Sequence, residues 1–388
     1  MKKILSSMAV LALALSFASA DVKFSFYNKL YEEDAFVDHY DNGRDDDGNS
    51  ESVTDFMGIK NRMYFEVFTD RVDAMIKADV RFDDNDNDHY GLGGRLKDWY
   101  IEFRPVEIAT LSLHTGIFSD GSYLPIYDDN INAGNIGSDG LTFTLRPVEG
   151  LRLGVTAPFS MDSDWGDKNY FNGDKDENED ENDKFDFGIG AIYGQELFQI
   201  GFSVQDIADS DERQIGAYIN LPTLFGASEA VTVGAGFAHS EAYRAVVADK
   251  DTISLGHIEA DVSYKNLLSG YATLDFEKFG IAAEIAYNLS DDEPEVSIDG
   301  EPFDSYDLYS AASLSFGLAD KLSAAVTGKI LSDLSSKGDK NKTILFGAFG
   351  LEYEANEKNT LGCEFNIATK DKDWSIAIPV FWKYHFEK

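Results

Sequence analysis

The sequence predicts an all-β protein: a single antiparallel transmembrane β-barrel of about 16–18 strands, with short periplasmic turns and long acidic extracellular loops. Three observations lead to this prediction. The chain opens with a secretory signal, apolar and polar residues alternate along the rest of it, and its connections alternate between short turns and long polar loops. An exported sheet with one continuous apolar face can be stable in lipid if it closes on itself.

The first 20 residues have the three parts of a signal peptide. Lys2 and Lys3 precede the apolar run 4–17, and Ala18-Ser19-Ala20 supplies the small residues that a signal peptidase accepts. We therefore predict a signal peptide over 1–20 and one barrel domain over 21–388. No later segment approaches the length of a membrane helix, so the exported chain is either soluble or spans lipid as a closed barrel.

Composition narrows the function further. The formal net charge of −37 makes binding to nucleic acid unfavourable. The 28 Phe and 19 Tyr are too many for a disordered chain. Cys363 is the single cysteine, so no internal disulfide can form, and its place within an apolar alternation is typical of a small hydrophobic residue.

The alternation is clearest over 72–82. One face of this segment is apolar, with Val72, Ala74, Ile76, Ala78, Val80 and Phe82 at the even-numbered positions, and the other is largely charged, with Asp73, Met75, Lys77, Asp79 and Arg81 at the odd-numbered positions. This is the pattern of a strand with two different faces. The segment 57–67 has a similar pattern, and only residues 69–71 separate the two. They are therefore predicted to pair as an antiparallel hairpin.

The connections between such segments come in two kinds. Short ones are found at 104–107, 146–149, 194–197, 277–279, 318–321 and 355–359, and long ones at 32–54, 83–95, 119–139, 160–184, 206–212, 239–269, 290–304 and 331–342. The long ones hold most of the acidic residues, as the external loops of an outer-membrane barrel do. Both termini then lie on the short-turn side, which requires an even number of strands. Counting gives about 18, with 16 as the alternative because 240–270 is hard to divide.

The closing segment carries a resemblance to a known family. One face of it reads Trp374, Ile376, Ile378, Val380, Trp382, Tyr384 and Phe386, an apolar strand with aromatic ends, followed by Glu387 and Lys388. It resembles the terminal strand of the bacterial outer-membrane porin-like β-barrels. The resemblance implies a place in the cell outer membrane, in contact with its lipid. It also implies recognition by the barrel-assembly machinery and assembly as a homo-oligomer such as a trimer.

Basic residues gather on the strand faces opposite the apolar ones. We predict that they form a pore-lining basic wall, made of Lys23, Lys29, Lys60, Arg62, Lys77, Arg81 and Arg152. The alternative is a set of solvated or paired charges without selectivity. Glu66, Asp73 and Asp79 on the same strands could be their partners.

The long connection 119–139 is richer in glycine and apolar residues than the other loops. General porins fold their third outer loop into the channel. By that resemblance, Asp120, Asp128 and Asp129 form a candidate constriction loop facing the basic wall, where opposed charges would create a transverse field.

The sequence offers little for metal binding or catalysis. The acidic run 174–183 fails the EF-hand pattern, because Glu179 occupies the glycine position and Phe185 the position of the last glutamate. No His-Glu-x-x-His pair, nucleophile elbow or phosphate loop is present. We therefore predict no metal, no cofactor, no catalytic residue and no enzymatic activity.

The function predicted from these features is passive diffusion of small hydrophilic solutes through an outer-membrane porin-like channel. A second interpretation is a surface-exposed barrel with a closed lumen that acts as an adhesin or structural protein. A third, a secreted soluble β protein, would need a second layer of structure to cover the apolar faces of so many strands.

Overall fold

The computed structural model describes residues 21–30, 37–44, 50–53, 59–85, 89–113, 140–158, 187–195, 197–208, 210, 213–221, 231–245, 253–255, 258–260, 263–276, 278–289, 306–334 and 343–387. The predicted signal peptide over 1–20 lies outside these residues. Within them the regular elements are all strands. No helix in these ranges is long and apolar enough to cross a membrane.

The described residues form 23 strands. The first twelve are β1 (Asp21–Leu30), β2 (Val37–Arg44), β3 (Ser50–Val53), β4 (Ile59–Phe68), β5 (Val72–Asn85), β6 (His89–Val106), β7 (Ala109–Leu113), β8 (Gly140–Val148), β9 (Leu151–Pro158), β10 (Gly188–Gln195), β11 (Phe198–Gln205) and β12 (Gln214–Leu221). The others are β13 (Val231–Ala245), β14 (Ile253–Leu255), β15 (Ile258–Ala260), β16 (Ser263–Phe276), β17 (Phe279–Asn288), β18 (Leu308–Ala319), β19 (Leu322–Ser332), β20 (Thr343–Asn356), β21 (Asn359–Lys370), β22 (Asp373–Ala377) and β23 (Val380–Glu387).

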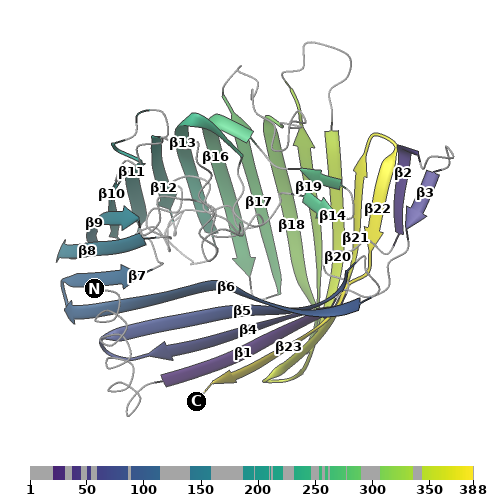
Figure 1. Ribbon diagram of the computed structural model, residues 1–388, viewed down its shortest axis with the longest axis horizontal. Helices are drawn as coiled ribbons and strands as arrows, with labels where there is room; N and C mark the ends of the chain where they lie inside the picture. The colour runs from purple at the N-terminus through teal and green to yellow at the C-terminus, as the bar shows by residue number, and fades with distance from the viewer. Residues whose placement is uncertain are drawn as a thin grey trace.

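Eighteen of these strands form a closed antiparallel ring, in agreement with the predicted fold class. They are β1, β4 to β13, β16 to β21 and β23, each paired with the next along the chain. The ring closes where β23 pairs with β1, with Phe24 opposite Phe386 and Leu30 opposite Val380 (Figure 1). Closure leaves no free edge in the ring, so every wall strand can satisfy its backbone donors and acceptors in lipid.

The ambiguous segment 240–270 is now divided. Its outer parts belong to the wall strands β13 and β16, which pair with each other. Between them, β14 and β15 form a separate two-stranded hairpin. Among the described residues the ring therefore has 18 strands, the number counted from the sequence, and the alternative of 16 is wrong.

The predicted hairpin around 69–71 is confirmed, with β4 paired to β5 from Phe68↔Asp73 to Ile59↔Phe82. Thr69 closes the turn. Its backbone N–H donates to the carbonyl of Val72 at 2.9 Å, and its Oγ1 accepts from the N–H of Val72 at 2.8 Å. A threonine hydroxyl that bonds its own backbone a few residues on is a usual turn device.

The predicted closing strand over 374–386 is two strands rather than one. β22 pairs with the far end of β21, and β23 pairs with its near end and with β1. Pro379 lies at the break and has no N–H to give to the ladder, although its carbonyl still accepts from Glu364 at 2.9 Å. Beyond the break, β22 pairs with β2 and β2 with β3, so the wall extends past the ring on this side (Figure 1).

The outer face of the ring is apolar. Exposed large apolar side chains follow one another from strand to strand, at Met63, Phe65, Ile76, Phe103, Leu111, Phe143, Val155, Ile189, Phe202, Ile219, Leu268, Ile285, Leu314, Val326, Phe349, Phe365 and Trp382. On a soluble protein this belt would be exposed to water, whereas on a membrane barrel it faces lipid.

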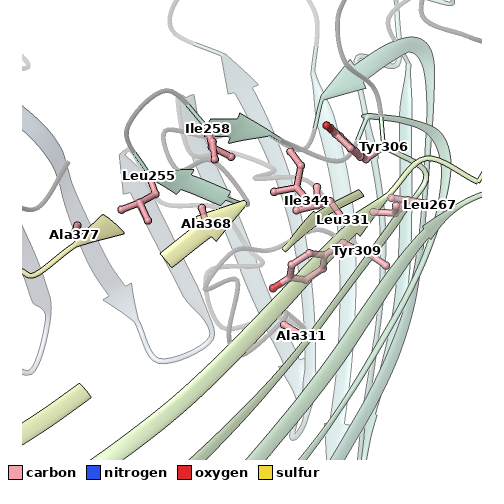
Figure 2. Packing of buried hydrophobic residues seen from close by; sticks show 12 residues of the cluster. Leu255, Ile258, Leu267, Tyr306, Tyr309, Ala311, Leu331, Ile344, Ala368 and Ala377 are labelled. Atoms are coloured by element: carbon pink, nitrogen blue, oxygen red, sulfur yellow. The ribbon is translucent and has the colours of Figure 1, made fainter. Parts of the chain in front are cut away.

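A cluster of buried apolar residues lies on the opposite, inner face. We call them the inner cluster, made of Ala238, Leu255, Ile258, Leu267, Ala286, Tyr306, Tyr309, Ala311, Leu331, Ile344, Ala368 and Ala377 (Figure 2). They come from wall strands between β13 and β22 and from the β14–β15 hairpin. The barrel therefore has a packed region inside its lumen.

Candidate functional site

The inner wall of the barrel is the candidate site, and three of the predicted basic residues form a row across it. Lys29 is the direct Cα partner of Lys60, and Lys60 is the direct partner of Arg81. Direct partners share one face of a sheet. On β4 this register position alternates with those of the exposed Met63 and Phe65, so the row belongs to the inner face. Like charges directly opposite each other are unfavourable for the fold but attract anions.

The next row toward the turns mixes charge with an aromatic residue. Tyr27 pairs with Arg62, Arg62 with Asp79, and Asp79 with Arg95. Arg62 is half-buried. Here each cation neighbours an acidic position, so this row carries less net positive charge than the one above it.

Arg95 was missed by the sequence analysis for a structural reason. The register between β5 and β6 shifts between Lys77 and Ala78, opposite Asp98 and Leu96. A β-bulge of this kind inserts one residue and reverses the alternation beyond it. Residues 89–98 therefore show no regular alternation in the sequence, although Arg95 and Asp98 both pair with inner positions of β5.

Two further predicted residues are held against aromatic rings. The Nζ atom of Lys77 lies 5.9 Å from the centroid of the Tyr64 ring, and that of Lys23 lies 5.5 Å from the Phe68 ring. Both distances suit a cation–π interaction. Lys23 also pairs across its strands with Glu66 and Glu387. Both lysines are thus packed along the wall. Lys23 lies near the turn end of the ring, and Lys77 lies closer to its middle.

Arg152 does not join the other basic residues. It is half-buried on β9 and its direct partner on β10 is Ile192. Strands β6, β7 and β8 separate β9 from β5. The predicted wall therefore consists of one group on β1, β4 and β5 and one separate arginine.

A second charged group lies at the turn end. Arg104 on β6 forms an ion pair with Asp73 and has Nη2 3.5 Å from Glu102 Oε2. The Asp73 side chain is only 16% exposed, so its charge is partly removed from water and the ion pair compensates for this. Sequence analysis placed Arg104 in a short turn, whereas β6 continues to Val106.

The part of the wall from β11 to β20 carries aromatic and amide groups. The Tyr309 hydroxyl donates to Glu284 Oε1, and both residues are buried. The Tyr271 hydroxyl donates to Asn220 Oδ1 at 3.1 Å. The Lys329 Nζ atom lies 5.6 Å from the centroid of the Phe346 ring. This side of the lumen is therefore less strongly basic than the row on β1, β4 and β5.

Three cross-strand pairs place an aromatic ring against a glycine. The pairs are Gly201–Tyr218, Gly234–Tyr271 and Gly362–Phe381, each in direct register. A Cβ atom built on Gly201 would lie 2.1 Å from Tyr218 Cε1, which is closer than any real contact allows. The glycines thus let the rings lie along the wall, so the rings take up less of the lumen.

The candidate constriction loop, with Asp120, Asp128 and Asp129, lies outside the described residues. Among the residues that are described, no group of three or more His, Cys, Asp or Glu side chains is arranged to hold a metal ion. The acidic run 174–183 also lies outside them. Cys363 is exposed on β21.

Comparisons with known proteins agree with this architecture. No protein-family model matches the chain, and no curated protein matches its sequence. Solved structures do match. OccAB3 of Acinetobacter baumannii is 11% identical, with a TM-score of 0.53 over 96% of this chain and 100% of that one. OpdQ of Pseudomonas aeruginosa is 11% identical, with a TM-score of 0.54 over 96% and 99%.

A third solved structure, OpdK of Pseudomonas aeruginosa with vanillate, is 15% identical and has a TM-score of 0.53 over 96% of this chain and 99% of that one. These neighbours are outer-membrane porins of the OprD/Occ family, channels rather than enzymes. At such low identity the likeness establishes the fold. The chain has the fold of an outer-membrane porin-like β-barrel.

Proposed function

We propose that this protein is a porin-like channel of the cell outer membrane through which small hydrophilic solutes diffuse passively. The observation that carries the proposal is the closed ring of 18 strands with an apolar outer belt and charged rows inside. The outer belt suits lipid, and a ring of this size encloses a lumen wide enough for solutes. The solved neighbours of the same fold are solute channels.

The basic row adds a preference among solutes. Lys29, Lys60 and Arg81 occupy directly paired positions on three neighbouring strands, and counter-ions are drawn to a row of basic residues at short range. At physiological salt the acidic loops are screened beyond about 8 Å, so the wall outweighs them in a narrow section. We therefore propose small anions, carboxylates among them, as the favoured solutes. OpdK was solved with vanillate, which is a carboxylate.

Reversal potentials in planar bilayers test both the channel function and the preference for anions. Under a salt gradient, the parent channel should favour anions, and Lys60→Ala/Arg62→Ala should shift the reversal potential toward cations. Lys321→Ala is the matched control, because Lys321 is exposed in the turn between β18 and β19. An unchanged potential at both low and high salt would show that these residues do not line the limiting section. The absence of any conductance would favour the adhesin or structural alternative.

We also propose that the third long connection contributes acidic groups to the pore. Asp120, Asp128 and Asp129 would face the basic row and create a field across the lumen. Asp128→Asn/Asp129→Asn should then make the channel more anion-selective in the same bilayer measurement. A selectivity equal to that of the parent would remove this loop from the constriction.

Export and assembly complete the proposal. We propose cleavage after Ala20, insertion by the barrel-assembly machinery through β23, and a homotrimer in the membrane. The start of β1 at Asp21 supports cleavage after Ala20. The aromatic pair Trp382 and Tyr384 on β23, with ring centroids 6.5 Å apart in an edge-on arrangement, supports a role of this strand in insertion. Mass spectrometry of the mature N-terminus and chemical cross-linking in outer-membrane vesicles test cleavage and oligomeric state.

A further inference from the structure

The β14–β15 hairpin departs from the wall and reaches across its inner side. It leaves the ring after β13 and returns to it at β16, which are direct neighbours in the wall. Its contacts, however, are with β21 and β22. Strands β17 to β20 lie between those two regions of the ring, so the hairpin contacts the wall four strands away from the strands that it connects (Figure 1).

Its sequence suits such a position. Leu255 pairs directly with Ile258, and the connection between them is Gly256-His257. A two-residue connection with glycine is typical of a tight hairpin. The alternate positions are the polar residues Ser254 and Glu259. This alternation is that of an element with one face on an apolar surface and one toward water.

The hairpin is docked by complete burial of its apolar pair. Leu255 is 3% exposed and Ile258 is fully buried. The wall residues Ile344, Ala368 and Ala377 are also fully buried. Figure 2 shows Leu255 and Ile258 on the hairpin near Ala368, and all three belong to the inner cluster. On a water-filled lumen these apolar wall residues would be exposed, and the hairpin contacts β21 and β22, the strands of Ala368 and Ala377, so it shields that part of the wall from water.

On β19 and β20, the exposure of inner side chains to solvent increases from the loop end of the barrel to the turn end. On β19 the inner positions run from the fully buried Leu331, through the half-buried Lys329, to the exposed Ser323. On β20 they run from the buried Ile344 to the exposed Glu354. On these two strands the inner face is therefore covered toward the loop end and exposed toward the turn end.

We propose that the β14–β15 hairpin is an internal strap that sets the limiting cross-section of the pore near its loop end. The proposal rests on the proposed channel function. Docking of Leu255 and Ile258 fixes the hairpin against β21 and β22, so the size limit for solutes depends on this apolar contact. Releasing the hairpin widens the passage without altering the strands of the ring.

The test compares single-channel conductance and the exclusion size for polyethylene glycols between the parent and two released variants. The first is Leu255→Asp/Ile258→Asp, which makes the docked face charged. The second replaces 253–260 with a Gly-Ser linker of equal length. Leu334→Asp is the matched control, because Leu334 follows β19 at the same end of the barrel and is 50% exposed. Ile258→Val retains the apolar contact and serves as the conservative variant.

Both released variants should show higher conductance and admit larger polymers, while Leu334→Asp and Ile258→Val should match the parent. Heat-modifiable gel mobility confirms that each barrel has formed before it is measured. If the parent conducts and both released variants have the same conductance and exclusion size as the parent, the strap proposal is overturned. If neither the parent nor the released variants conduct, the channel function itself fails. If the parent does not conduct but the released variants do, the result supports both the channel function and the strap.

Discussion

Tyr309 and Glu284 form a buried hydrogen bond between neighbouring strands on the inner wall. The tyrosine hydroxyl on β18 donates to Oε1 of the glutamate on β17. Tyr309 is fully buried and Glu284 is 3% exposed. Leaving a buried carboxyl group without hydrogen-bond donors is strongly unfavourable, so this contact satisfies Glu284 within the apolar inner cluster.

Removing the hydroxyl should destabilise the barrel. Tyr309→Phe is expected to lower the free energy of unfolding by about 1–3 kcal/mol, because Glu284 then loses a donor in a buried place. Urea unfolding in lipid bilayers measures this. The loss should be smaller when Glu284→Gln is already present. Ser313→Ala, which removes a neutral hydroxyl contact to Thr327 at 2.9 Å, is the control and should have a smaller effect. Equal effects of the two single changes would contradict the argument.

The outer face of β5 should not tolerate a cation. Ile76 is 49% exposed within the apolar belt, and an arginine there costs about 2–4 kcal/mol near the bilayer midplane. Ile76→Arg should therefore lower the yield of folded, heat-resistant barrel in vesicles. Met75→Arg is the matched control, because Met75 precedes it on the inner face and pairs with Glu66. A normal yield of Ile76→Arg would show that this face does not contact lipid.

The glycine under Tyr218 should resist enlargement. Gly201→Ala places a methyl group where the ring lies, and overpacking of this kind typically costs about 1–3 kcal/mol. Urea unfolding should show the loss, and Tyr218→Ala in the same chain should remove most of the further effect of the methyl group. Gly317→Ala is the control, because no atom lies within 4 Å of a Cβ built there. Identical stabilities of Gly201→Ala and Gly317→Ala would mean that the ring moves aside freely.

The orientation of the barrel predicts which connections are reached from outside the cell. An epitope tag near Gly173, in the long acidic connection 160–184, should be detected on intact cells because such loops face outward. That connection lies outside the described residues. A tag at Lys358, in the short turn between β20 and β21, should be detected only after permeabilisation. The reverse labelling would invert the topology.

The ring of strands could be predicted from the sequence because its pattern is local. The hairpin of β4 and β5 needs only alternation and a three-residue turn, both visible in 57–82. The rows of Lys29, Lys60 and Arg81 follow once adjacent strands are paired. Where the register shifts, as beside Arg95, the alternation in the sequence does not predict the face of a residue, because a bulge changes which side chains share a face.

The contents of the lumen depended on the tertiary structure. Residues 253–260 show a short alternation that does not say which surface covers Leu255 and Ile258. Ala368 and Ala377, on the strands that the hairpin contacts, lie far along the chain and come near it only through the tertiary structure of the ring. The same holds for Tyr309 with Glu284 and for the ring of Tyr218 over Gly201. Alternation is imposed by the backbone of each strand, whereas contacts inside the lumen depend on the stagger and curvature of the whole closed sheet.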